Sequence, residues 1–185
     1  MKVISVNIGE RRTIHYKNKL VETGIYKLPV DTPIFLDFED VQKDAVVDRK
    51  HHGGIEQAVY AYSKEHYEYW KQLYPEIDWH YGIFGENLTI ENFDEKNIHV
   101  GAIYQLGEAK IEVTKPRQPC YKLGIRFNDP KIIKQFWNST MSGVYFKILK
   151  SGNVCAGDEL ILIQEAKKTP TIAKVYERKR TEKGV

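Results

Sequence analysis

The sequence predicts a mainly β domain, built as a barrel-like sheet with a few peripheral helices. Short stretches rich in Val, Ile, Tyr and Phe are separated by turn residues, which is typical of strands. The helical patterns between them are too few for alternating βαβ units, so a barrel or sandwich is favoured. The predicted strands are residues 2–8, 33–38, 57–62, 87–90, 103–106, 109–115, 144–150 and 159–164.

Two of the connections are predicted to be tight hairpins. Gly107 and Glu108 form a two-residue link between two predicted strands, where glycine accepts the backbone conformation of a tight turn. The segment 151–153 (Ser-Gly-Asn) follows the alternating run 144–149 and predicts a second hairpin.

Three helices interrupt the strands, and each has a recognisable start. Ser63 is predicted to cap a helix that runs to about Tyr74, just before a proline. Asp129 and Thr169 are each followed by proline, a combination typical of the first turn of a helix. The apolar stripes of these helices are interpreted as core side chains rather than cofactor contacts.

Length and composition indicate a soluble globular protein. A chain of 185 residues and 21.6 kDa fits one domain, which we place at residues 1–165, followed by a short helical tail at 166–185. No apolar run approaches the roughly 18 residues of a membrane span, so no membrane contact is expected. The N-terminus lacks the features of a secretory signal, so we expect a cytoplasmic protein in which Cys120 and Cys155 are unpaired.

The charge of the chain gives a weak indication of its ligand. A formal net charge of +3 and a pI near 8.7 are mildly basic, which slightly favours an anionic ligand. The basic stretch 177–183 is predicted to be a solvated, partly frayed tail. No strip of basic and aromatic residues is evident, which argues against nucleic-acid binding.

Cys120 carries the clearest chemical signal. It lies in the segment 115–122 (Lys-Pro-Arg-Gln-Pro-Cys-Tyr-Lys), with Arg126 close behind and no acidic residue from 114 to 128. Neighbouring cations favour the thiolate, which makes Cys120 a candidate metal ligand or nucleophile. The two prolines predict a defined loop after a strand rather than a helix. The alternative is a small buried cysteine without a reactive role.

A second candidate is the segment 48–54 (Asp-Arg-Lys-His-His-Gly-Gly). Gly53 and Gly54 allow the backbone to approach a ligand closely, and His52 can transfer protons near neutral pH. Adjacent histidines point to opposite faces of an extended segment, so the pair is a poor metal chelate. The alternative is a surface turn with one hydrogen-bonded histidine.

The turn 84–87 (Phe-Gly-Glu-Asn) is a third candidate. Glu86 can transfer a proton or anchor a basic side chain, and Asn87 can donate to a ligand oxygen. A purely structural turn is the alternative. The segment 140–145, with hydroxyl groups around Gly143, can offer donors to a phosphate, but it lacks the glycine spacing of nucleotide-binding motifs.

In this order along the chain, the motifs resemble the MOSC domain, named for the C-terminal domain of molybdenum cofactor sulfurase. The matching segments are 52–54 (His-Gly-Gly), 85–88 (Gly-Glu-Asn-Leu), 116–122 (Pro-Arg-Gln-Pro-Cys-Tyr-Lys), and 143–145 leading to 157–158. Segments 23–27 and 64–70 are similar to the stand-alone bacterial YiiM-like branch. Where related sequences often have Gly-Asp before the His-Gly-Gly stretch, this chain has Lys43-Asp44 and then Val47-Asp48.

The resemblance implies a MOSC-type β-barrel-like fold and the molybdenum cofactor (Mo-molybdopterin), whose metal is bound by the motif cysteine. A soft thiolate suits molybdenum, and clustered Arg and Lys suit the anionic parts of the cofactor. The expected site residues are Cys120, His52 and Glu86 for catalysis, Arg117, Lys122, Arg126, Asn87, Gly53 and Gly54 for cofactor binding, and Cys120 as the metal ligand.

Two functions fit these residues. Some relatives reduce N-hydroxylated bases and related compounds with electrons from partner redox proteins. The first hypothesis is therefore a molybdenum-dependent oxidoreductase that converts N–OH to N–H in a small molecule. The alternative is a non-catalytic carrier of the cofactor, or of sulfur held as a persulfide on Cys120. The same thiolate serves both functions, so the sequence leaves them open.

Overall fold

The structure, a computed structural model, describes residues 1–47 and 53–184 and is mainly β, as the sequence predicts. Its strands are β1 (Lys2–Gly9), β2 (Arg12–Tyr16), β3 (Lys19–Thr23), β4 (Lys27–Val30), β5 (Ile34–Leu36), β6 (Val59–Ser63), β7 (Leu88–Glu91), β8 (Ile103–Leu106), β9 (Ala109–Pro116), β10 (Val144–Lys150), β11 (Gly152–Val154) and β12 (Leu160–Gln164). Its helices are the short 3₁₀ turn η1 (Ile55–Gln57), α1 (His66–Leu73), α2 (Tyr121–Arg126), α3 (Lys131–Ser139) and α4 (Ile172–Lys183).

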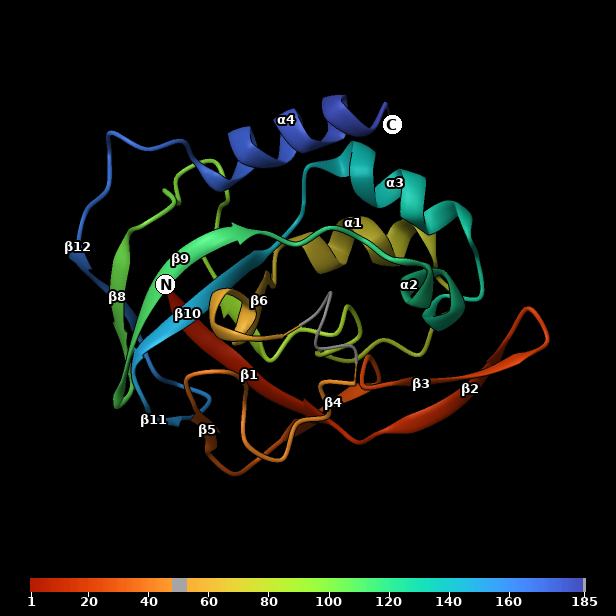
Figure 1. Cartoon of the computed structure of the whole chain (residues 1–185), viewed down its shortest axis with the longest axis horizontal. Coiled ribbons are helices and arrows are strands. Elements are labelled where there is room, and N and C mark those ends of the chain that lie inside the picture. Colours follow the sequence, from red (N-terminus) through yellow and green to blue (C-terminus); the bar gives the residue numbers. More distant parts are fainter. Residues whose placement is uncertain (48–52, 185) are drawn as a thin grey trace.

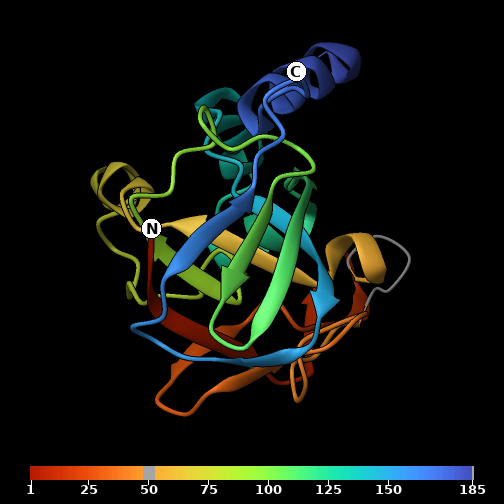
Figure 2. The same cartoon turned by 90° about the vertical axis from the view of Figure 1, so that its left-hand side faces the viewer.

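One large mixed sheet organises the molecule. Eight strands pair in the order β12-β8-β9-β10-β6-β7-β1-β4. The pair β6–β7 is parallel, and the other ladders of this sheet are antiparallel. Buried side chains alternate with outward ones along β9, so one face of the sheet packs on the apolar core. Figure 2 shows the strong curvature of the sheet.

The pairing of the described strands does not close into a barrel. The strands β4 and β12 end the order, and no ladder joins them in the part of the chain that the structure describes. A single bridge from Lys2 to Glu159 links the start of β1 to the segment before β12, supported by a 2.9 Å bond from the Leu160 amide to the Met1 carbonyl. The fold is therefore a strongly curved open sheet, and the expected barrel is realised only in part.

The predicted helices are present, with their starts shifted by two residues in two cases. The Ser63 hydroxyl donates to the Glu65 side chain instead of capping α1, which begins at His66. The cap of α4 is Thr171, whose hydroxyl accepts from the Lys174 amide, rather than Thr169. Asp129 accepts from the Lys131 amide at 2.9 Å and so holds the first turn of α3. Among the described helices, none is long and apolar enough to cross a membrane.

Helix α2 is the main helix that the sequence prediction missed. The prolines at 116 and 119 do favour an extended segment, but the chain turns into a helix directly after Cys120. Cys120 is its N-cap residue, with an extended backbone (φ −123°, ψ 168°). Cys120 therefore lies between the loop that follows β9 and the first turn of α2.

Two β connections also differ from the prediction. The segment 151–153 does not fold back on β10, because β11 pairs with β5 instead. Strands β2 and β3 form a separate hairpin with positive φ at Lys17 and Asn18, as expected for a tight primed turn. Figure 1 shows this hairpin extending from the sheet below α2.

The C-terminal helix is packed on the body of the protein. Ile172 is fully buried in the main core, and the ring of Tyr176 stacks on Trp137 with 4.8 Å between centroids. Figure 1 shows α4 passing over the C-terminal end of α3. The stretch 177–183, expected to be partly frayed, is helical and mostly exposed.

Candidate functional site

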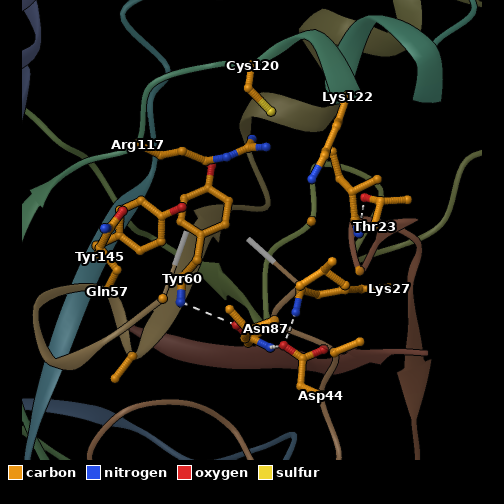
Figure 3. A pocket seen from close by; sticks show the side chains of 18 residues that line it. Thr23, Lys27, Asp44, Gln57, Tyr60, Asn87, Arg117, Cys120, Lys122 and Tyr145 are labelled. Carbon is orange, nitrogen blue, oxygen red and sulfur yellow. Dashed lines mark hydrogen bonds and ion pairs between the residues drawn. The ribbon is translucent and has the colours of Figure 1, made fainter. Parts of the chain in front are cut away.

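A pocket of about 90 Å³ lies between the large sheet, the loops after β3 and before η1, and the start of α2. Figure 3 shows side chains from these elements pointing into it. The lining residues are Thr23, Gly24, Ile25, Lys27, Asp44, Ala45, Val46, Val47, Gly53, Gln57, Ala58, Tyr60, Gly85, Asn87, Arg117, Cys120, Lys122 and Tyr145. The pocket thus gathers five of the predicted site residues.

The upper side of the pocket is cationic and carries the thiol. Figure 3 shows Cys120, Arg117 and Lys122 pointing toward the same space. Arg117 is 4% exposed and Lys122 is 7% exposed, so both charges are largely removed from water. No carboxylate of the described residues forms an ion pair with either side chain. Buried charges require partners, so this side of the pocket is suited to an anion.

Arg117 is held in place by aromatic rings rather than by carboxylates. Its guanidinium carbon lies 5.0 Å from the ring centroid of Tyr60 and 5.8 Å from that of Phe136. These distances are within the range of cation–π contacts. Its Nη1 atom is buried and has no hydrogen-bond partner among the described residues. The Arg117 guanidinium is therefore fixed in orientation, and part of its hydrogen-bonding capacity is unused.

Tyr60 and Tyr145 form the wall opposite Lys122. Their ring centroids are 5.1 Å apart, and burial raises the pKa of both hydroxyls. Both therefore stay protonated at neutral pH. The Tyr60 hydroxyl donates to the Ser142 carbonyl at 2.9 Å, which fixes its ring beneath Arg117.

A buried polar network forms the floor of the pocket. Asp44 pairs with Lys27 and accepts hydrogen bonds from the Gly9 amide at 2.8 Å and from Asn87 Nδ2 at 2.9 Å. Asn87 Oδ1 in turn accepts from the Tyr60 amide at 3.4 Å. The side chains of Lys27 and Asp44 are 8% and 2% exposed. Breaking such a buried pair is costly, so the network fixes the floor.

Glycine forms part of the wall because a side chain would not fit there. A Cβ atom on Gly24 would lie 1.7 Å from the Ala45 carbonyl oxygen, so the two loops touch through their backbones. Gly85 has φ +81°, and its Cβ would lie 3.1 Å from Ile25. Gly53 lines the pocket, whereas Gly54 does not.

Glu86 does not lie in the pocket, so the geometry does not support its expected catalytic role. It is fully buried, and its carboxylate accepts from the Gly82 amide at 2.9 Å, the Phe84 amide at 3.1 Å and the Thr89 hydroxyl at 3.0 Å. Tyr67 also donates to it. Burial raises the pKa of Glu86 against these hydrogen bonds. The carboxyl group holds the turn that presents Gly85 and Asn87.

Arg126 and His52 are the two remaining predicted site residues. Arg126 lies at the end of α2, is not among the pocket-lining residues, and stacks over Tyr26. His52 lies outside the described residues, so its predicted role stays a prediction.

Sequence reasoning missed Tyr60 in the aromatic wall and Lys27 and Asp44 in the polar floor, whereas it included Asn87. Tyr60 lies in a strand where every residue is buried, so its pattern indicated only a core strand. Lys27 and Asp44 are far apart in sequence and meet only through the fold. The Lys43-Asp44 pair within the resemblance was the one signal that pointed toward this floor.

Comparisons with known proteins agree with these motifs. A family model described as MOSC domain matches residues 48–161. The chain is 35% identical to YflK of Bacillus subtilis over 166 residues, which are 90% of this chain and 75% of YflK. It is 37% identical over 147 residues to a protein named Reductase from Gibberella moniliformis, covering 78% of this chain but only 26% of that relative.

A solved structure supports the same assignment. The crystal structure of YiiM from Geobacillus stearothermophilus has a TM-score of 0.81 and 31% sequence identity to this chain, covering 100% of this chain and 86% of that one. Fold, motif order and sequence identity agree with the resemblance to the MOSC domain. The chain belongs to the MOSC domain family.

Proposed function

We propose that the pocket binds the molybdenum cofactor and that the protein reduces N-hydroxylated small molecules there. Membership of the MOSC family makes this cofactor the first to consider. A relative named Reductase supports redox chemistry in a related chain. The observation that carries the proposal is the buried Nη1 atom of Arg117, which lacks a described partner and lies beside the Cys120 thiol in one pocket.

The residues present fit such a cofactor. The Cys120 sulfur is a soft ligand of the kind that suits molybdenum together with the sulfur atoms of a pterin dithiolene. Arg117 and Lys122 are buried and have no described carboxylate partner, so they would hold the cofactor's phosphate and other anionic oxygens. Asn87 and Gly53 would contact the remaining polar edges, and Gly54 would shape the loop next to them.

When bound, the cofactor supplies the two-electron chemistry at molybdenum. The protein itself binds and orients the cofactor and the substrate, and it excludes water from the pocket. Tyr60 and Tyr145 stay protonated, so their hydroxyls do not compete as anions for Arg117. The Lys27–Asp44 pair already satisfies both charges and keeps the floor rigid. His52 is the residue proposed to supply a proton.

The proposed reaction is a two-electron, two-proton reduction of the N–OH group. The N–O bond of the N–OH group breaks and an N–H bond forms, while the oxygen leaves as water. Two electrons come from a redox partner protein, and two protons come from solvent through the protein. The substrate is reduced and the donor is oxidised. We propose a cytoplasmic setting for this exchange, with a soluble electron donor.

The reaction is tested by supplying electrons without a partner protein. Cofactor-loaded protein is incubated with reduced methyl viologen and an amidoxime such as benzamidoxime, and formation of the amidine is measured. The wild type is expected to turn over, whereas Cys120→Ala is not. Cys155→Ala, which changes the other free cysteine outside the pocket, should retain the wild-type rate.

A carrier function predicts a different result. A carrier would hold the cofactor without forming the amidine, or would show a labile sulfur adduct on Cys120 by mass spectrometry. Either result, obtained with fully loaded wild-type protein, would contradict the reductase and favour the carrier.

A further inference from the structure

A second cationic group, which we call the Tyr26 cluster, consists of Arg12, Tyr26 and Arg126. The guanidinium carbon of Arg126 lies 4.5 Å from the ring centroid of Tyr26, and that of Arg12 lies 5.2 Å from it. The start of β2, the loop before β4 and the end of α2 meet here. Two positive charges therefore share one aromatic ring.

The Tyr26 cluster borders the pocket. Arg126 follows Lys122 by four residues in α2, so the two side chains lie on the same face of the helix, one turn apart. Lys122 lines the pocket, as do Ile25 and Lys27 on either side of Tyr26. Positive charge thus extends along α2 from Lys122, which lines the pocket, to Arg126, which does not.

No counter-charge neutralises the Tyr26 cluster in the part of the chain that the structure describes. Neither Arg12 nor Arg126 forms an ion pair with a described carboxylate, whereas the adjacent Arg11 pairs with Glu22 at 3.1 Å. The Nε atom of Arg126 is buried and has no hydrogen-bond partner among the described residues. The cluster therefore offers positive charge to a ligand, and part of the hydrogen-bonding capacity of Arg126 is unused.

Among the described residues, the side chain of His80 hydrogen-bonds to the guanidinium of Arg126. Nδ1 of His80 lies 2.7 Å from the Tyr81 carbonyl oxygen, which only accepts, so this nitrogen carries the proton. Nε2 of His80 then accepts from Arg126 Nη2 at 2.7 Å. His80 orients the guanidinium without cancelling its charge.

We propose that the Tyr26 cluster binds the phosphate of a phosphomonoester, so that the substrate of this site is a phosphorylated N-hydroxylated compound. The inference rests on the proposed function. A phosphomonoester carries a charge of about −1.5 to −2 near pH 7, which matches two guanidinium groups better than a carboxylate does. The planar fork of arginine also suits the geometry of phosphate oxygens.

The binding step is tested on metal-free protein with adenosine 5′-monophosphate as the probe and adenosine as its uncharged counterpart. Titration calorimetry is expected to give tighter binding of the monophosphate. Arg12→Gln and Arg126→Gln should each weaken it about tenfold, the scale of one charge-assisted contact. Neither change should affect adenosine. Arg12 is exposed on a hairpin, so Arg12→Gln remains informative if Arg126→Gln fails to fold.

Two further variants, Arg11→Gln and Lys122→Gln, test where the phosphate binds. Arg11→Gln lies on the same hairpin but removes a cation that Glu22 already neutralises, so it should bind the monophosphate like the wild type. Equal affinity in the wild type, Arg12→Gln and Arg126→Gln would overturn the proposal. So would a loss of affinity confined to Lys122→Gln, because the phosphate would then lie in the pocket.

The calorimetry requires neither molybdenum nor turnover, so it separates this inference from the proposed function. A protein that binds the monophosphate through Arg12 and Arg126 but never reduces an N–OH group supports the binding site and contradicts the reductase. With active protein, Arg12→Gln should raise KM for an N-hydroxylated nucleotide and leave KM for the matching nucleoside unchanged. Equal increases in the two KM values would contradict the phosphate site.

Discussion

Arg117 combines a buried charge with unused hydrogen-bonding capacity. Two aromatic rings contact its guanidinium, yet its Nη1 atom has no described partner. A buried charge that lacks a partner lowers the stability of the empty protein. The same charge becomes favourable when an anion enters the pocket. Such a residue lowers the stability of the ligand-free protein and strengthens the binding of an anion.

Replacing Arg117 should therefore have two opposite effects. We expect Arg117→Met to raise the free energy of unfolding of the cofactor-free protein by about 1 kcal/mol, because an apolar side chain of similar length replaces the charge. The same variant should lose the cofactor. Denaturant unfolding and pterin fluorescence of the purified protein measure the two effects. Arg11→Met, at the exposed ion pair, should change neither. A less stable Arg117→Met protein that keeps its pterin would contradict this account.

Glu86 has a structural role, and the stability that it contributes depends on pH. Burial raises its pKa, so between the ordinary pKa of glutamate and the raised one the folded protein binds more protons than the unfolded chain. The stability that protonated Glu86 contributes is present at low pH and is lost as pH rises through this window. An exposed, hydrogen-bonded carboxylate has the opposite pH dependence, because its pKa is lowered and the stability that it contributes is lost as pH falls.

Glu86→Gln tests this direction, because it keeps the size of the side chain and removes its titration. We expect the unfolding free energy of the wild type, relative to Glu86→Gln, to fall as pH rises from 4.5 toward neutrality. Denaturant unfolding at a series of pH values measures the difference. Hydrogen bonds from Asn153 lower the pKa of the exposed Glu108, so the stability of the wild type relative to Glu108→Gln should stay nearly constant above pH 4.5 and fall as pH decreases below it. Matching slopes for the two variants would contradict the assignment.

At the scale of elements, the turn before β10 brings the pocket wall together. Gly143 has φ +66°, and a Cβ atom there would lie 2.5 Å from the Ala61 carbonyl oxygen and 2.6 Å from the Tyr60 ring. The strand β10 can approach β6 this closely only because residue 143 has no side chain. Tyr60 and Tyr145 are thereby paired across the two strands.

Two glycine variants separate backbone strain from collision. Gly143→Ala and Gly157→Ala both introduce a side chain at positive φ, but a Cβ on Gly157 meets nothing within 4 Å. We expect Gly143→Ala to cost about 1–3 kcal/mol more than Gly157→Ala, the range for overpacking. It should also displace Tyr60. Thermal and denaturant unfolding measure the cost, and equal losses for the two variants would contradict the role of the contact.

Most of the strands that the sequence predicted are rich in Val, Ile, Tyr and Phe. The strand β9 alternates buried and exposed residues and was found, whereas β2 and β3 are almost wholly exposed and carry no such pattern. The helix α2 was missed because prolines before it favour an extended chain. Arg117, Cys120 and Lys122 were found because they are neighbours in sequence. Tyr60, Lys27 and Asp44 were missed because only the fold brings them together.

At the scale of the whole molecule, the C-terminal segment contributes to the core. The Ile172 amide donates to the Ile98 carbonyl at 2.8 Å, and the Tyr176 hydroxyl donates to the Phe136 carbonyl at 3.1 Å. Both side chains are fully buried. The division into a domain of residues 1–165 and a tail of residues 166–185 stays a prediction, but these contacts argue that the domain needs the tail.

Truncation and a point variant test this dependence. We expect Tyr176→Ala to lower the free energy of unfolding by about 3 kcal/mol, as large aromatic deletions in cores do. A chain ended after residue 165 should be less stable still, because it also loses Ile172. Lys174→Ala, on the exposed side of the same helix, should be close to neutral. A truncated protein as stable as the full chain would show that residues 1–165 fold alone.

The central claim is that Cys120 and its cationic pocket hold the molybdenum cofactor. The most direct measurement is the molybdenum and pterin content of wild type, Cys120→Ala and Cys155→Ala, each purified from a host that makes the cofactor. The wild type and Cys155→Ala are expected to contain molybdenum and pterin in near-stoichiometric amounts, and Cys120→Ala to lack the metal. Equal molybdenum in Cys120→Ala and wild type, or none in any of the three proteins, would contradict the claim.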